Sequence, residues 1–320
     1  MVDFALNRAG RGQRQKFADL GFKLATWLAA LLVLLLLGGV IVALVEGAWP
    51  ALQKFGPAFV VTEVWNPVRD NFGALAPMVG TLITAAIAML FGIPISFGIA
   101  VFLTQLCPVW ARRPLGIAIE LLAGIPSIIY GIWGLFVFAP FLQDHFEPLI
   151  IDTLGTLPGI GALFAGPPLG IGVLTAGLIL GIMVLPFISS IMRDVFDTVP
   201  PMLKESAYGL GATTWEVVWN VVLPYTRVGV VGGIMLGLGR ALGETMAVTF
   251  VIGNAHRIST SLLAPGTTIS AALANEFTEA VSDIYQSALI ALGLVLFVIT
   301  LIVLSIAKLL LMRLEKQAGT

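Results

Sequence analysis

Charged side chains inside long apolar segments are the residues of this sequence whose types and spacing suit chemistry. Arg240 and Glu244 stand four residues apart in the apolar segment 228–253, and Glu120 stands in the segment 114–139. A central Arg in a bilayer is unfavourable by about 2.5 to 3.5 kcal/mol on insertion scales, so each charge needs a partner or a function. The planar donors of an Arg side chain match the geometry of an oxyanion.

Two interpretations of Arg240 and Glu244 stay open. Residues i and i+4 share a helix face, so the pair can form an ion pair that neutralises itself and holds neighbouring helices together. Alternatively, Arg240 contacts an anion in transit, and Glu244 positions the guanidinium or helps to release the anion. Arg240 lies about 12 residues, or roughly 18 Å, into its segment, near the middle of a bilayer. Glu120 lies closer to one side, and we expect it to snorkel to the interface.

The elements that must position these charges are membrane helices. The 320 residues are 58% hydrophobic and 11% charged, with a mean hydropathy of +1.00. Soluble domains carry roughly 25% charged residues, so a water-soluble fold is excluded, and so is disorder, which needs low hydrophobicity. A helix of about 20 apolar residues crosses a bilayer. We therefore predict an all-α polytopic membrane protein with six transmembrane helices, at 24–45, 78–104, 114–139, 169–192, 228–253 and 286–307.

The distribution of Lys and Arg predicts the orientation of these helices, because both residues resist translocation. Thirteen of the 17 fall near the two termini, at Arg112 and Arg113, or in the loop 193–227. Both termini and this loop are therefore expected to be cytoplasmic. The apolar but glycine-rich segment 149–165 is expected on the outside, as a re-entrant or interfacial stretch. We expect one membrane domain, 24–312, between the cytoplasmic tails 1–23 and 313–320.

The first half of the loop 193–227 carries the start and stop signals of a short helix. Pro200 and Pro201 suit a first helical turn, and Gly209 and Gly211 supply a permissive backbone for the stop. The helix between them is amphipathic. Exposed apolar residues of this kind are expected to contact a partner protein or lipid headgroups. The residues are Met202, Leu203, Tyr208 and Leu210.

The second half of this loop predicts another short helix. Thr213 with Glu216 fits a capping box, which starts a helix over 215–222 that Pro224 is expected to end. Beyond it, small residues recur at a spacing of four and predict close helix packing. They are Gly229, Gly233, Gly237, Ala241 and Thr245.

The loop resembles the EAA loop of the membrane subunits of ABC importers, in which Glu-Ala-Ala is followed by Gly and by Ile-x-Leu-Pro. The corresponding residues are Glu205-Ser206-Ala207, Gly211 and Val221-Val222-Leu223-Pro224, with Ser206 and Val221 as departures. The resemblance implies a type I ABC importer permease fold whose cytoplasmic coupling helices seat in an ATPase subunit. The residues implied at that joint are Lys204, Glu205, Ser206, Ala207 and Gly211.

Two further segments resemble signatures of the permease subunits of the bacterial phosphate importer. They are 239–248, Gly-Arg-Ala-Leu-Gly-Glu-Thr-Met-Ala-Val, and 125–131, Ile-Pro-Ser-Ile-Ile-Tyr-Gly. Pro126 is expected to bend or interrupt its helix and to free backbone groups nearby. Alternatively, Pro126 only produces a kink that lets the helix pack against its neighbours. The resemblance, to PstC-type subunits over nearly the whole chain, implies that phosphate passes beside Arg240, Glu244, Thr245, Ser127 and Tyr130.

This resemblance also implies the partners. They are a PstA-type second permease, two PstB-type cytoplasmic ATPases and a PstS-type phosphate-binding protein outside, all at the bacterial cytoplasmic membrane with its lipid; no nucleic acid is expected. The sequence has no Gly-Lys dipeptide and hence no Walker A loop. We therefore expect no cofactor and no enzyme activity in this chain, with ATP and Mg at the partner ATPase. One Cys and two distant His give a metal site little to be built from.

Two alternatives stay open. The importer carries another oxyanion, such as sulfate, molybdate or phosphonate, or the chain is an ion-coupled secondary transporter in which Glu244 and Glu120 carry protons.

Overall fold

The computed structural model describes residues 2–318, and the side chains of residues 19–309 and 311–313. Within this part the chain is helical, without a β-strand. The α-helices are α1 (Val2–Phe55), α2 (Ala58–Val61), α3 (Leu75–Val101), α4 (Val109–Ala123), α5 (Ser127–Trp133), α6 (Ala139–Phe141), α7 (Glu147–Thr153), α8 (Val173–Asp197), α9 (Pro201–Gly209), α10 (Thr214–Val217), α11 (Leu223–Leu242), α12 (Met246–Val251), α13 (Ile269–Glu276) and α14 (Asp283–Ala318). Short 3-10 helices cover Pro67–Arg69 and Gly161–Phe164, and π-helical turns cover Phe102–Leu106, Gly134–Phe138, Leu142–Phe146 and Val218–Val222.

Within the described residues, six helical segments are long and apolar enough to cross a membrane, which confirms the expected number. One of them, Ser127–Thr153, joins the three short helices α5, α6 and α7 through two π-helical turns. The segments are Asp19–Phe55, Leu75–Leu106, Ser127–Thr153, Val173–Asp197, Thr214–Leu242 and Asp283–Arg313.

The third segment differs from the expected span 114–139. The chain breaks at Gly124–Pro126, so residues 109–123 form the separate helix α4, and the crossing helix starts at Ser127. Pro126 lacks an N–H, and its ring disfavours a helical conformation for Ile125, which favours a break at this position. Glu120 therefore lies on α4, outside the six segments that are long and apolar enough to cross a membrane.

The fifth segment also differs from the expected span 228–253. It begins already at Thr214, in the loop, and ends at Leu242. Gly243 caps α11, and a non-helical step through Glu244 and Thr245 separates α11 from the short helix α12.

The expected tails are not separate from the outer helices. α1 runs without interruption from Val2, and α14 continues to Ala318. Of these tails, residues 1, 319 and 320 lie outside the described part.

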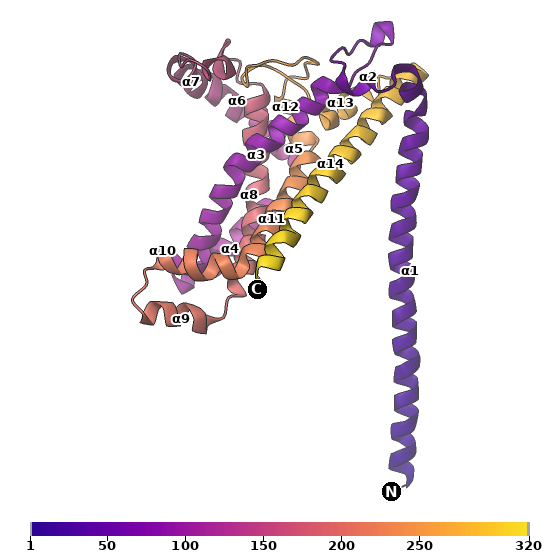
Figure 1. The fold of residues 1–320 in the computed structure, drawn as a ribbon, viewed down its shortest axis with the longest axis vertical. Coiled ribbons are helices and arrows are strands. Elements are labelled where there is room, and N and C mark those ends of the chain that lie inside the picture. Colours follow the sequence, from indigo (N-terminus) through magenta and orange to yellow (C-terminus); the bar gives the residue numbers. More distant parts are fainter. Residues whose placement is uncertain (1, 319–320) are drawn as a thin grey trace.

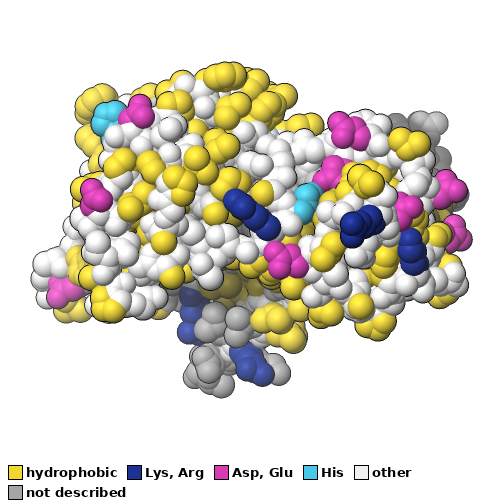
Figure 2. All heavy atoms as spheres, turned by 90° about the horizontal axis from the view of Figure 1, so that it is seen from above, with side chains coloured by type: hydrophobic (Ala, Val, Ile, Leu, Met, Phe, Trp, Pro, Cys, Tyr) yellow, Lys and Arg dark blue, Asp and Glu magenta, His cyan; other side chains and the backbone are white. Residues whose placement is uncertain are grey.

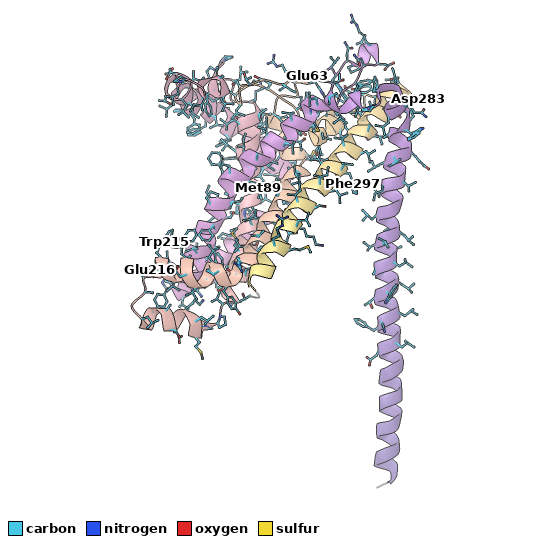
Figure 3. The ribbon with its side chains drawn as sticks, in the orientation of Figure 1. Glu63, Met89, Trp215, Glu216, Asp283 and Phe297 are labelled. Carbon is cyan, nitrogen blue, oxygen red and sulfur yellow. The ribbon has the colours of Figure 1, made fainter. Side chains whose placement is uncertain are left out.

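The helices form a bundle with two distinct ends (Figure 1). The two ends of the chain lie toward the same end of the bundle as α9 and α10, which we name the coupling end, whereas α2, α7 and α13 lie at the opposite far end. Figure 3 shows Trp215 and Glu216 at the coupling end, and Glu63 and Asp283 at the far end. The segment 149–165, comprising most of α7 and the 3-10 helix after it, belongs to the far end, where Leu163 O accepts a hydrogen bond of 2.8 Å from Leu262 N.

Helix α1 packs against α14 only over its last turns, near the far end, where Ala48 and Ala51 are buried together with Leu289 and Leu292. At the far end, Ser287 Oγ accepts from Ala51 N at 3.0 Å and donates to Gly47 O at 2.7 Å. From there α1 stands apart (Figure 1), and its apolar side chains over residues 20–37 are exposed within this chain. A long apolar stretch that is exposed within its own chain, as residues 20–37 are, is suited to contact with lipid or with another membrane subunit.

Helix α8 is the centre of the core. It packs along α3 and α11, and Ile179, Leu180 and Val184 on it are fully buried. Three residues join α8 to α9, so the coupling end is connected in the chain to this central helix.

Candidate functional site

Two helix breaks bring the expected pathway segments together. The break at Gly124–Pro126 precedes α5, and the break at Gly243–Thr245 precedes α12. A Cβ at Gly131 of α5 would lie 2.8 Å from Phe250 Cδ2 and 3.1 Å from the Cα of Ala247 on α12. Segments more than 100 residues apart in the sequence are therefore packed face to face, which requires glycine at this contact.

Arg240 lies in the last turn of α11 and is exposed within this chain. Its guanidinium carbon lies 5.8 Å from the centroid of the Phe187 ring on α8, within cation–π distance. Among the described side chains, Arg240 forms no ion pair. No described carboxylate of this chain therefore neutralises the guanidinium.

Glu244 does not pair with Arg240, so the interpretation of the two as a self-neutralising ion pair is wrong. The helix ends between them, at Leu242, and they no longer share a helix face. Glu244 Oε1 instead accepts a hydrogen bond of 3.3 Å from Ala247 N in the first turn of α12. This carboxylate satisfies a backbone donor that the break would otherwise leave free.

The ladder of small residues packs α11 tightly on α8, as expected. A Cβ at Gly229, Gly233 or Gly237 would approach an α8 side chain to 2.6, 2.9 and 2.5 Å, respectively. The α8 residues contacted are Val195, Ile191 and Ile188. Ala241 continues the buried face, whereas Thr245 has left the helix and lies in the break, with its Oγ1 3.4 Å from Gly243 O.

Ser127 begins the first turn of α5 and Tyr130 ends it. The Tyr130 hydroxyl donates a 2.9 Å hydrogen bond to Leu122 O, one of the carbonyls at the end of α4. Pro126 therefore interrupts the helix, as expected, and Tyr130 closes the break. Ser127 is half-buried, and its hydroxyl has no hydrogen-bond partner in the described part of the chain.

Glu120 does not snorkel alone but pairs with Arg193 on α8. The distance from Arg193 Nη2 to Glu120 Oε1 is 2.6 Å, and the guanidinium also contacts Asp194 at 2.9 Å. Gly116 leaves room for this arrangement, because a Cβ there would lie 2.7 Å from Arg193 Nη1. The Glu120 side chain is 51% exposed, so the pair contributes little stability. It ties α4 to the end of α8 that leads into the loop 193–227, which we name the coupling loop.

The coupling loop has the expected start and stop signals. Pro201 opens α9 after Pro200, and Gly211, at φ +89°, adopts the left-handed conformation that favours glycine. Thr213 and Glu216 form the capping box, with Thr213 N donating to Glu216 Oε2 at 2.8 Å.

The residues expected at the ATPase joint occupy both faces of α9. Ala207 packs against the core and Lys204 is half-buried, whereas Glu205, Ser206 and Gly211 are exposed. Two apolar side chains project beside them, Met202 at 75% and Leu210 at 90% exposure. A single chain has nothing to cover this surface.

Pro224 does not end the second helix of the loop, so that prediction is wrong. The π-helical turn Val218–Val222 precedes it, and Pro224 lies in the first turn of α11. The wider turn changes the hydrogen-bond pattern there, so the chain passes the proline without stopping.

A polar cluster at the far end has no counterpart in the sequence-based expectations. Glu276 accepts hydrogen bonds from Trp65 Nε1 at 2.6 Å and Tyr285 Oη at 2.6 Å, and His256 Nε2 lies 2.5 Å from its carboxylate. Burial raises the pKa of Glu276, but these partners outweigh burial and hold the pKa below its ordinary value of 4.5. The cluster joins the loop before α3, the loop after α12, α13 and α14. Its partners come from positions too far apart for any spacing rule to detect.

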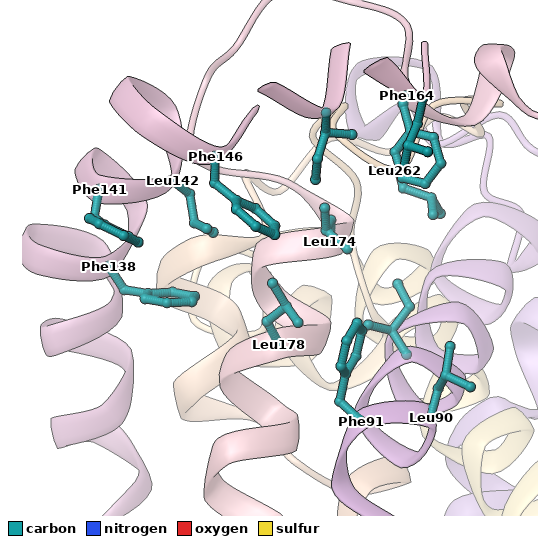
Figure 4. Close-up of a pocket in the computed structure, with 13 residues that line it drawn as sticks. Leu90, Phe91, Phe138, Phe141, Leu142, Phe146, Phe164, Leu174, Leu178 and Leu262 are labelled. Atoms are coloured by element: carbon teal, nitrogen blue, oxygen red, sulfur yellow. The ribbon is translucent and has the colours of Figure 1, made fainter. Parts of the chain in front are cut away.

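A second buried carboxylate at the far end is that of Glu147, which is 1% exposed and accepts a 2.9 Å hydrogen bond from Gly170 N. Figure 2 looks down on the far end and shows acidic side chains distributed among apolar ones. Below it lies a cavity of about 510 Å³ lined entirely by apolar side chains of α3, of residues 138–164, of α8 and of Leu262 (Figure 4). An anion has no partner in such a cavity, because burying a charge without one is costly. Within the described residues, no group of three or more His, Cys, Asp or Glu is placed to hold a metal ion.

Sequence comparisons place the chain among known transport proteins. Residues 92–316 match the family described as "Binding-protein-dependent transport system inner membrane component". The chain is 64% identical to "Phosphate transport system permease protein PstC" of Mesorhizobium japonicum, over 96% of this chain and 94% of that protein. It is 59% identical to the protein of the same name from Pasteurella multocida, over 94% of each.

Solved structures show the same fold at low identity. A chain of the inward-facing MetNI methionine ABC transporter matches with a TM-score of 0.54 at 16% identity, over 75% of this chain and 95% of that one. A chain of a bacterial ABC transporter that imports alginate matches with a TM-score of 0.57 at 16% identity, over 90% and 96%. The fold is that of type I ABC importer permeases. Since the family match covers most of the chain, this protein belongs to the family of binding-protein-dependent transport system inner membrane components.

Proposed function

We propose that this chain is a membrane subunit of an ATP-driven importer of inorganic phosphate and acts by alternating access, without chemistry on its substrate. The observation that carries this proposal is the similarity to phosphate transport permeases over nearly the whole chain. The unpaired guanidinium of Arg240 at a helix break supplies the matching chemistry. Interrupted membrane helices are a recurrent way to present polar groups to a substrate within a bilayer.

Arg240 contacts the phosphate during its passage. No carboxylate within the described residues neutralises its side chain, and a guanidinium offers parallel N–H donors to two oxygens of one anion. Glu244 acts on the anion only indirectly, by capping α12 and so fixing the break beside Arg240. Thr245, Ser127 and Tyr130 line the same passage from the two breaks.

The finer assembly follows the family resemblance. α9 seats in a PstB-type ATPase, two copies of which bind ATP and Mg, and a PstA-type permease covers the exposed apolar faces of this chain. The coupling end then faces the cytoplasm, with both termini, and the far end receives a PstS-type phosphate-binding protein. The position of α9, with Met202 and Leu210 exposed beside it, supports this orientation.

Phosphate uptake by cells that carry Arg240→Gln tests the role of Arg240. Labelled phosphate uptake is expected to fall at least about tenfold, the effect of losing roughly 1.4 kcal/mol of interaction with the anion. Arg113→Gln, an exposed Arg on α4, is the matched control and retains uptake. Wild-type uptake by Arg240→Gln, at normal levels of the protein in the membrane, would remove Arg240 from the mechanism.

Purification of the complex tests the class of transporter. Glu205→Lys reverses an exposed charge on α9, and we expect it to lose the copurifying ATPase, whereas Glu279→Lys at the far end keeps it. An ion-coupled secondary transporter would show no ATPase in either preparation. Competition of sulfate, molybdate and phosphonate against labelled phosphate separates the phosphate importer from one for another oxyanion.

A further inference from the structure

The guanidinium of Arg240 lies beside the ring of Phe187, a residue that no motif of the sequence indicates. In the described part of the chain the guanidinium has neither a hydrogen bond nor an ion pair to hold it, and Glu244 is turned to α12. The aromatic ring of Phe187 lies 5.8 Å from its central carbon. We propose that Phe187 is a positioning residue, which holds the Arg240 guanidinium in place for the anion; this proposal rests on the proposed function.

An aromatic face is well suited to this task. It attracts a cation through its quadrupole without accepting N–H hydrogen bonds in the guanidinium plane, so those donors stay available to phosphate. A carboxylate in the same place would neutralise the cation and compete with the anion for its donors. Phe187 therefore holds the side chain while leaving both its charge and its hydrogen-bonding capacity intact.

The packing of α8 against α11 fixes this contact. Gly237 of α11 lies against Ile188, the residue after Phe187, so closely that a Cβ would approach Ile188 Cγ1 to 2.5 Å. Ile188 is fully buried. Because the two backbones are held this close within one helical turn of Arg240, its side chain remains within reach of the Phe187 ring.

The same contact connects the anion site to the coupling end. Phe187 follows Pro186, a proline within α8, and prolines within helices are points where helices bend. The coupling-end half of α8, from Phe187 to Asp197, leads into α9 through three residues. A displacement of α9 transmitted along α8 moves the ring relative to the guanidinium, and thus changes how firmly Arg240 is held when phosphate must be released.

Graded fluorination of the ring tests this role, because fluorine weakens the cation–π attraction and changes the size of the ring little. Phenylalanines with one, two and three ring fluorines are introduced at position 187 by nonsense suppression. The assembled transporter is reconstituted in vesicles with its ATPase and binding protein. The maximal rate of phosphate uptake is expected to fall stepwise, by about fivefold for the trifluorinated ring. The phosphate concentration for half-maximal uptake stays unchanged, because the binding protein sets it.

Substitutions provide the controls. Phe187→Trp keeps a strong cation–π face and is expected to retain uptake within twofold of wild type, whereas Phe187→Leu falls to the level of the trifluorinated ring. Phe91→Leu, in the apolar cavity of Figure 4, stays at the wild-type rate. Uptake that is constant along the fluorinated series, or equal in Phe187→Trp and Phe187→Leu, overturns the proposal for Phe187. Normal uptake by Arg240→Gln overturns instead the proposed function of the guanidinium itself, so the two failures are distinguishable.

Discussion

The close packing of α11 on α8 makes one substitution especially informative. In Gly237→Ala, the new Cβ lies 2.5 Å from Ile188 Cγ1, 2.6 Å from Ile188 Cδ1 and 3.3 Å from Val184 Cγ1. Both neighbours are fully buried and have no room to turn away. Gly232 is the matched control, because it lies on the same helix and a Cβ there meets nothing within 4 Å in this chain.

The magnitude follows from two opposing terms. Gly→Ala in a helix interior stabilises by about 0.5 to 1 kcal/mol, through the lower conformational entropy of the unfolded chain. Forcing an extra methyl group into a packed core typically costs about 1 to 3 kcal/mol. The helix term is common to both variants, so Gly237→Ala is expected to be less stable than Gly232→Ala by about 1 to 3 kcal/mol.

Unfolding of the purified chain in mixed micelles of increasing SDS content, followed by circular dichroism, measures this difference. The free energy of unfolding is compared between the two variants, with wild type expected between Gly232→Ala and Gly237→Ala. Equal stability of the two variants, or higher stability of Gly237→Ala, would refute the close approach of α11 to α8 and the placement of Arg240 that depends on it.

Three further outcomes test other parts of the structure. The pKa of Glu276 is held below its ordinary 4.5, so its ionised form stabilises the fold above pH 4.5, and this contribution is lost as the pH falls through the lowered pKa. Glu276→Gln should therefore reduce the loss of thermal stability at acidic pH. A loss equal to that of the wild type would contradict the hydrogen bonds and ion pair of the Glu276 cluster. Thr213→Ala should speed amide exchange over 214–217 by about fivefold, the effect of losing a helix cap, while Thr213→Ser exchanges like wild type. Glu120→Gln should lower the free energy of unfolding in SDS by less than about 1 kcal/mol, and by less still at high salt, because an exposed ion pair is screened. A larger decrease that does not depend on salt would show that the pair with Arg193 is not exposed.

Local signals in the sequence predicted the coupling loop and the packing of α11 well. The capping box of Thr213 and Glu216 and the stop near Gly211 depend on neighbouring residues alone, so the sequence contains all that they need. The spacing of Gly229, Gly233 and Gly237 likewise marks a closely packed face, because i and i+4 residues align on any regular helix.

The errors arose where helices depart from regularity. Hydropathy does not detect the helix breaks at Gly243 and before Pro126. We therefore predicted one span each for 228–253 and 114–139, although neither segment is one helix. The π-helical turn before Pro224 had the opposite effect and carried a helix past a residue expected to end it. Such irregularities depend on tertiary packing and cluster at functional sites.

Contacts between distant segments could not be predicted at all. Phe187 near Arg240, Arg193 on Glu120 and the partners of Glu276 each join separate helices or loops. A single sequence carries no information on which side chains meet after folding, and Phe187 is one of 19 phenylalanines. The charge of Arg240 pointed to a pathway, whereas its support became visible only in three dimensions.

Contact between phosphate and Arg240 in the assembled transporter is the most direct test. The complex is prepared with nitrogen-15 in its arginine side chains, loaded with phosphate through its binding protein and trapped with a hydrolysis-deficient ATPase. Solid-state NMR then measures the dipolar coupling between phosphorus-31 and guanidinium nitrogen-15. A short-range coupling that is present in the wild type and absent in Arg240→Gln is the predicted result. A coupling that survives the substitution, or no coupling in a complex that retains its phosphate, would contradict the role of Arg240 as the anion contact.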